Sequence, residues 1–99
     1  MGIIDNISKL FESRLRLGIM AILMVNDKVD FNTLKEHLGA SDGNLASHIK
    51  ALEKNELIEV QKQFVGRKPQ TTYLATKLGR LSFEKHIEGL NNLIKGMEK

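Results

Sequence analysis

The sequence contains no cysteine and no tryptophan, and it has one proline and one tyrosine. Without cysteine the protein can form neither disulfide bonds nor a metal site with thiolate ligands. Long apolar runs are also missing, because the longest one, residues 19–25, is too short to cross a membrane. The first residues include Asp5 and lack the positive start and apolar core of a signal peptide. We therefore expect a cytoplasmic protein with no membrane partner.

The length and charge of the chain set broad limits. A chain of 99 residues corresponds to one domain, here 1–99, with a core so modest that pairing with a second copy would help to stabilise it. Lysine and arginine total 15 against 12 aspartates and glutamates, which gives a formal net charge of +3. A mildly basic balance is weak evidence for a polyanionic partner.

The N-terminal third is predicted to be helical and rich in apolar residues. Apolar residues at helical spacing predict a short amphipathic helix containing Ile3, Ile4, Ile7, Leu10 and Phe11. Ser13 is suited to cap a second helix over residues 14–26, which is apolar around nearly its whole circumference. Such a helix must be buried on more than one side, which a monomer of this size can hardly arrange. This pattern favours a homodimer.

The middle of the chain has the signals of two consecutive short helices. Asp30 is suited to cap a helix over residues 31–38, and Gly39 is suited to end it in a left-handed conformation. Ser41 can cap the next helix, which runs to about residue 54. Two helices joined by a short segment around a glycine form a helix-turn-helix, here over residues 30–55.

The pattern then changes from helical to strand periodicity. Residues 57–64 and 71–74 read as two strands, and residues 65–69 read as a hairpin tip because they contain glycine and the one proline. This hairpin would form a wing over residues 57–74. Thr76 is suited to cap a final helix over residues 76–98. Its apolar residues have heptad-like spacing, and they predict a dimer interface made with residues nearer the N-terminus: Ile3, Ile7, Phe11, Phe83, Ile87, Leu90, Ile94 and Met97.

One face of the second short helix has the chemistry of a DNA-reading surface. Opposite its apolar residues Leu45, Ile49 and Leu52 lie small, hydrogen-bonding or positive side chains. These candidates for contact with a major groove are Ser41, Gly43, Asn44, Ser47, His48, Lys50 and Lys54. On the hairpin tip, Arg67 and Lys68 are candidates for contact with phosphates or a minor groove. The simpler alternative for the helix residues is an ordinary solvated face, and for the hairpin tip it is a charged turn that aids solubility.

Three blocks of sequence resemble the small stand-alone winged helix regulators related to the MarR and ArsR groups. They are residues 42–48 (DGNLASH), 52–60 (LEKNELIEV) and 64–73 (FVGRKPQTTY). The resemblance implies a dimeric bacterial or archaeal transcription factor with residues 41–54 as its recognition helix. Gln70 stands where the resemblance implies an arginine, which makes this wing less basic. The cysteines of metal-sensing ArsR-type proteins are absent, so the resemblance does not imply metal sensing of that kind.

These observations predict a mainly helical winged helix-turn-helix protein with an added N-terminal helix and a long C-terminal dimerisation helix. Its predicted partners are double-stranded DNA and a second copy of itself, and its predicted role is a repressor on a pseudo-palindromic site. The rival functions are a protein-interaction module in a larger assembly and single-stranded nucleic acid binding.

We expect neither a cofactor nor a metal. An enzyme is not expected, because His37, His48 and His86 fall on three different predicted helices and form no known motif. No pattern identifies a small-molecule effector.

Overall fold

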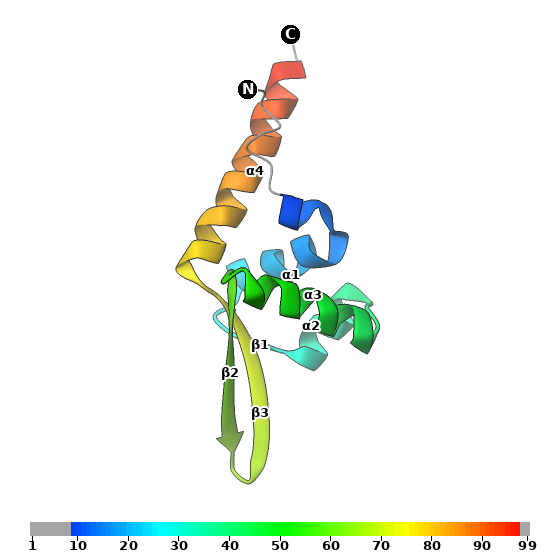
Figure 1. Ribbon diagram of the computed structural model, residues 1–99, viewed down its shortest axis with the longest axis vertical. Coiled ribbons are helices and arrows are strands. Elements are labelled where there is room, and N and C mark those ends of the chain that lie inside the picture. The colour runs from blue at the N-terminus through cyan, green and yellow to red at the C-terminus, as the bar shows by residue number, and fades with distance from the viewer. Residues whose placement is uncertain (1–8, 98–99) are drawn as a thin grey trace.

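The computed structural model describes residues 9–97 and has the element order of a winged helix-turn-helix (Figure 1). The elements are a short 3-10 helix η2 (Lys9–Glu12), helix α1 (Arg14–Val25), strand β1 (Val29–Asp30), helices α2 (Phe31–Leu38) and α3 (Asp42–Lys54), strands β2 (Ile58–Val65) and β3 (Lys68–Ala75), and helix α4 (Lys77–Met97). The strands form an antiparallel sheet in the order β1-β3-β2. The predicted fold class is thus confirmed.

Four of the predicted helix starts are made by a side-chain oxygen. The oxygen accepts a hydrogen bond from the backbone N–H three residues later, at 2.8–3.3 Å, in the four caps Ser13, Asp30, Ser41 and Thr76. This bond satisfies one of the backbone donors that a helix leaves unpaired at its first turn. Gly39 ends α2 with φ 59°, in the left-handed region that favours glycine. Together these local signals place the two helices of the helix-turn-helix as predicted.

Helix α1 lies at the centre of the core. Its residues Ile19, Met20 and Leu23 are fully buried, and α2, α3, α4 and β3 all contact it. Ala21 and Val25 remain exposed. The expectation that this helix needs a second chain to cover it was therefore wrong, because the other elements of one chain already bury most of its circumference. The helix also ends one residue early, where the side chain of Asn26 donates to the carbonyl of Ile22.

Only part of the predicted N-terminal helix and of the predicted dimer interface lies within the described residues. Ile3 and Ile7 lie outside them, and so does the side chain of Met97. The described segment before α1 is a 3-10 helix. It buries Phe11, whose ring meets those of Phe83 and His86 edge-on with centroid distances of 5.8 and 5.2 Å. Burial lowers the pKa of His86, because the charged imidazolium loses its hydration there.

The hairpin turn is tighter than predicted. Strands β2 and β3 pair from Ile58 with Ala75 out to Val65 with Lys68, so Gly66 and Arg67 alone form the turn. Gly66 has φ 67°, and a glycine with positive φ at the first central position is typical of the type II′ hairpin turn. Lys68 and Pro69 therefore belong to β3, not to the tip. Proline is tolerated there because, within the described residues, β1 pairs with β3 only at Thr72 and Tyr73 and leaves the far half of β3 as an edge.

The molecule is elongated, with extents of 59 × 26 × 21 Å. The hairpin of β2 and β3 projects from one end of the helical body, and the C-terminal part of α4 projects from the other (Figure 1). The surface that was predicted to bind DNA is thus separated from the C-terminal half of α4 by the packed helices.

Candidate nucleic-acid interface

Helix α3, which was predicted to be the recognition helix, has one buried face and one polar face. Leu45, Ile49 and Leu52 are buried in the core. On the other side the predicted contact residues Ser41, Gly43, Asn44, Ser47, Lys50 and Lys54 are all exposed, and His48 is half-buried at the boundary. The structure thus places the predicted residues on one accessible helix face. This arrangement leaves amide, hydroxyl and ammonium groups free to meet base edges and phosphates.

The first turn of α3 is held without help from the Asn44 side chain. The Ser41 hydroxyl oxygen accepts from the backbone N–H of Asn44 at 3.3 Å, and the Ser41 carbonyl accepts from the backbone N–H of Leu45 at 3.0 Å. The exposed Asn44 amide is therefore not the cap. Gly43 beside it has open space around it, because a Cβ built there would meet no described atom within 4 Å. Packing therefore gives no reason for a glycine at this position.

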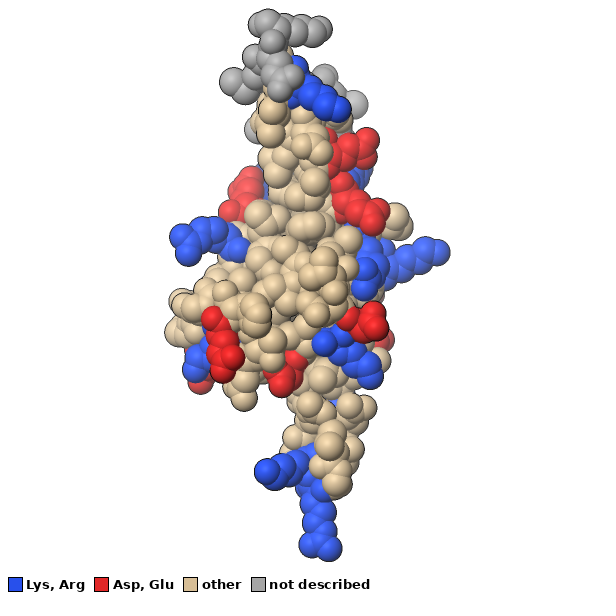
Figure 2. Space-filling view, turned by 180° about the vertical axis from the view of Figure 1, so that it is seen from behind, with Lys and Arg blue, Asp and Glu red and all other residues tan. Residues whose placement is uncertain are grey.

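Positive charge dominates the predicted surface. The acidic residue at the start of α3, Asp42, forms an ion pair with Lys35 of α2 at 2.7 Å. Residues 60–75 of the wing include Lys62, Arg67 and Lys68 and contain no aspartate or glutamate. Figure 2 shows basic atoms and no acidic ones at the far end of the wing on the face in view. A polyanion could approach this end without like-charge repulsion.

The strand register shows which wing residues face α3. Side chains alternate between the two faces of a strand, and Val60 and Tyr73 lie opposite each other on the face turned toward α3. Lys62 and Thr71 form the next pair outward on that face. With Lys50 of α3 they line a cleft of about 340 Å³ between α3 and the wing. Lys62 and Thr71 were not among the predicted site residues, although strand alternation from the apolar Val60 and Tyr73 could have indicated them.

Arg67 and Lys68 differ in position although both are exposed. Arg67 lies in the turn itself, whereas Lys68 pairs with Val65 and its side chain belongs to the wing face turned away from α3. Arg67 is therefore the better placed of the two for contact beyond the tip.

The base of the wing is joined to α3 and α4 by hydrogen bonds that end on backbone carbonyls. The N–H of Leu57 bonds to the carbonyl of Leu52, and the N–H of Glu56 bonds to the carbonyl of Glu53, which is the Schellman ending of a helix. The Thr76 hydroxyl donates to the Glu56 carbonyl at 2.7 Å. Glu56 itself has φ 61°, a left-handed conformation that is unfavourable for a residue with a side chain. These bonds set the direction in which the wing leaves α3.

Tyr73 marks the inner end of the cleft. Its pKa is raised, first by burial and then by the nearby negative charge of Glu53. The phenol therefore stays neutral at physiological pH, and the cleft becomes basic only further out.

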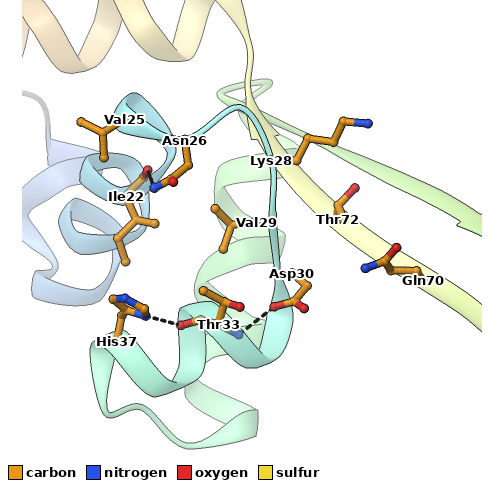
Figure 3. Close-up of a pocket in the computed structure, with 10 residues that line it drawn as sticks. All are labelled: Ile22, Val25, Asn26, Lys28, Val29, Asp30, Thr33, His37, Gln70 and Thr72. Atoms are coloured by element: carbon orange, nitrogen blue, oxygen red, sulfur yellow. Dashed lines mark hydrogen bonds between the residues drawn. The ribbon is translucent and has the colours of Figure 1, made fainter. Parts of the chain in front are cut away.

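A second and larger hollow lies on the opposite face of the wing. It has a volume of about 540 Å³ and is lined by the end of α1, by β1, by α2 and by β3 (Figure 3). At its floor the Thr33 N–H donates to the Asp30 carboxylate at 2.8 Å, and the His37 ring contacts the Thr33 carbonyl at 2.9 Å (Figure 3). Hydrogen bonds from Thr33, the side-chain one first, lower the pKa of Asp30.

The predicted dimer residues are divided between the core and the surface. Phe11 is 2% exposed, so one chain already covers it and a partner would have little of it left to contact. We therefore omit Phe11 from the interface. Phe83 and Leu90 are half-buried, whereas Ile87 and Ile94 are exposed on α4. Among the described residues no helix is long and apolar enough to span a membrane, and no group of histidines and carboxylates is arranged to hold a metal ion.

Comparison with known families identifies the arrangement. The family model for the winged helix DNA-binding domain matches residues 15–94. The chain belongs to this family. The match covers the helix-turn-helix, the wing and most of α4.

Three relatives give the scale of the similarity. An uncharacterized protein of Methanocaldococcus jannaschii is 36% identical over 91% of this chain and 98% of its own length. A transcriptional regulator homologue from Pyrococcus horikoshii OT3 is 30% identical, with a TM-score of 0.84 over 93% of this chain and 91% of that one. A structure described as a transcriptional regulator of the MarR family, from Porphyromonas gingivalis W83, shares the fold with 24% identity and a TM-score of 0.66 over 92% and 85% of the two chains. The resemblance to small winged helix regulators is thus confirmed.

Proposed function

We propose that this winged helix protein binds specific sites on double-stranded DNA as a homodimer and represses transcription by occupying them. The observation that carries the proposal is the outer face of α3, where Asn44, Ser47 and Lys50 are exposed beside the basic wing. Such a helix can enter a major groove and read base edges with its N-terminal residues. A regulator of this kind acts where the chromosome is, so we place it in the cytoplasm.

The rival function, a protein-interaction module, would favour an apolar docking face. The exposed large apolar residues of the described chain lie on α1, the wing and α4, and none lies on α3. Charged side chains are also depleted at the centres of protein interfaces. The recognition face is therefore better suited to DNA than to a protein partner.

Selection of binding sites from random duplex DNA tests the proposal. Recovery of a palindromic sequence is expected, because two helices related by a two-fold axis read two half-sites. Failure to bind any duplex DNA at low salt would contradict the proposal.

Two substitutions on α3 separate base reading from phosphate contact. An asparagine can pair with adenine through two hydrogen bonds worth about 1–3 kcal/mol of discrimination, so Asn44→Ala should weaken binding to the selected site far more than to random DNA. Lys50→Ala should weaken both equally. A melting curve provides the control, since the Ser41 cap does not use the Asn44 side chain. An unaltered ratio of specific to random affinity would remove Asn44 from the base-reading residues.

The proposed dimer interface uses Phe83, Ile87, Leu90 and Ile94 of α4. Ile94 is 58% exposed in one chain, and burying such a side chain contributes about 1.5–3 kcal/mol. The double variant Ile87→Lys and Ile94→Lys should therefore be monomeric in light scattering at micromolar concentration. A matched control is Leu78→Lys with Leu81→Lys, since these exposed leucines lie on a different side of α4. A dimer that survives the first pair and is lost with the second would contradict the assigned face.

A further inference from the structure

The larger hollow, of about 540 Å³, has walls of two kinds. Figure 3 shows the aliphatic side chains of Ile22 and Val25 on one side of β1. The polar side chains of Lys28, Gln70 and Thr72 lie on the other side of that strand (Figure 3). Small-molecule sites usually measure about 300–1,000 Å³ and combine apolar walls with a few polar groups that orient the ligand. The hollow therefore has the size and the composition of such a site.

Thr72 is a buried polar residue in the wall of the hollow. It is 7% exposed, and its Oγ1 atom forms no hydrogen bond with a described residue. Strand alternation turns its side chain to the wing face that lines the hollow, opposite to the face of Tyr73. A buried hydroxyl without a partner is unfavourable, so a ligand group that bonds to it removes this cost.

A carboxylate stands directly across from this hydroxyl. Asp30 of β1 pairs with Thr72 of β3, and cross-strand partners carry their side chains on the same face, with Cβ atoms about 5 Å apart. Because hydrogen bonds from Thr33 lower the pKa of Asp30, its carboxylate is negatively charged at neutral pH. A carboxylate can accept more hydrogen bonds than those from one neighbour. Asp30 and Thr72 thus offer two adjacent acceptors to a positively charged donor.

The opposite charge comes from Lys28, two residues earlier in the chain. Lys28 is exposed, lines the hollow, and forms no ion pair with a described residue. Residues two apart in an extended segment are separated by about 7 Å, so Lys28 and Asp30 can contact the two charged groups of one small ligand. The side-chain amide of Gln70 adds a further donor on the same side of β1 (Figure 3).

We propose that the larger hollow binds a free α-amino acid with an aliphatic side chain. Its ammonium group donates to the Asp30 carboxylate and the Thr72 hydroxyl. Its carboxylate accepts from Lys28 and Gln70, and its side chain packs on the aliphatic residues at the end of α1. A singly charged ligand is less well matched, because Lys28 would repel an amine and Asp30 would repel a carboxylate.

Calorimetric titration of the full chain with L-leucine and three truncated analogues tests the ligand class. The analogue 3-methylbutylamine lacks the carboxylate, 4-methylpentanoate lacks the ammonium group, and glycine lacks the side chain. Leucine should bind, and each analogue should bind at least about tenfold more weakly, because a hydrogen bond to a charged group or a buried aliphatic side chain contributes that much. Equal binding by any analogue, or no binding of leucine at millimolar concentration, would overturn the proposal.

Two charge variants locate the ligand in the hollow. Asp30→Asn keeps the cap of α2, because asparagine caps helices as well as aspartate does, but it removes the negative charge. Asp30→Asn and Lys28→Gln should each weaken leucine binding about tenfold. Asp27→Asn is the matched control, since Asp27 is exposed in the same loop and does not line the hollow, and its affinity should equal that of the wild type. Wild-type affinity in Asp30→Asn would overturn the proposal.

Thr72→Val separates a binding role of the hydroxyl from a structural one. Valine keeps the branched shape and removes the buried hydroxyl, so the melting temperature of the free protein should rise. Leucine binding should nevertheless weaken by about tenfold, whereas a purely structural threonine would show the rise in melting temperature alone and overturn the proposed contact. All these measurements are made without DNA, so their outcome is independent of the proposed function.

Discussion

The protein has a packed half and an exposed half, and the two meet along α3. The packed half comprises α1, the inner face of α3 and the junction where β2 and α4 begin, and it is held by buried side chains and backbone hydrogen bonds. The exposed half comprises the outer face of α3 and the wing beyond Val60, where most side chains are free in solution. The contrast indicates that the packed half fixes the angle between helix and wing, while the exposed half supplies the chemistry of contact.

Two glycines illustrate this contrast. A Cβ on Gly79 would fall against the carbonyl oxygen of Leu57, whereas one on Gly43 would meet no described atom within 4 Å. The first glycine is required by close packing of α4 against the base of the wing. The second is not required by the fold, which agrees with the proposal that DNA approaches α3 closely.

The largest effect is expected from Gly79→Ala. The added methyl must displace backbone at the junction, and overpacking of this kind destabilises a protein by about 3 kcal/mol. Urea denaturation measures the change. Gly43→Ala is the matched control, since it should not lower the free energy of unfolding but should weaken DNA binding by preventing close approach. Equal stability of the two variants would show that Gly79 is no more constrained by packing than Gly43 is.

A smaller effect, on affinity alone, is expected from Arg67→Ala combined with Lys68→Ala. Both side chains are exposed, so the melting temperature should not change. Loss of two phosphate contacts would lower the magnitude of the salt slope by about 1.8, and loss of one by about 0.9. Because Lys68 points away from α3, the single variants should differ, with most of the loss in Arg67→Ala. A double variant with wild-type affinity and slope would show that the tip does not touch DNA.

Local signals in the sequence were sufficient to predict the helix starts and the outer face of α3. Ser13, Asp30, Ser41 and Thr76 form caps with partners three residues away, so no distant part of the chain is needed to recognise them. The failures depend on tertiary contacts. Phe11 was assigned to a dimer interface, but α4 of the same chain covers it. The role of Lys62 becomes visible only when the register and the position of α3 are known.

Glu56→Gly should produce a modest stabilisation. Glu56 adopts φ 61° because the Schellman ending of α3 requires it, and a left-handed conformation is unfavourable by about 1 kcal/mol for a residue with a side chain. Glycine would relieve most of this strain, and the Thr76 bond to the carbonyl of residue 56 would remain. The midpoint of urea denaturation should therefore rise while DNA affinity stays constant. A lower midpoint would mean that the flexibility of glycine in the unfolded chain outweighs the relieved strain.

The smallest effect at neutral pH is expected from His86, because its protonation changes the free energy of unfolding only in acid. Burial lowers its pKa in the folded protein, while in the unfolded chain it takes up a proton near its ordinary pKa of about 6.5. Below that pH the unfolded state binds more protons, so the free energy of unfolding should fall as the pH falls, until the folded protein also protonates. Urea midpoints at pH 8.0 and 5.5 measure the change. His86→Leu keeps an apolar group against Phe11 and should lose this part of the acid sensitivity, since no imidazole remains to be protonated there. If the variant and the wild type lose the same stability between the two pH values, His86 is not the titrating group, and the acid response must come from elsewhere in the chain.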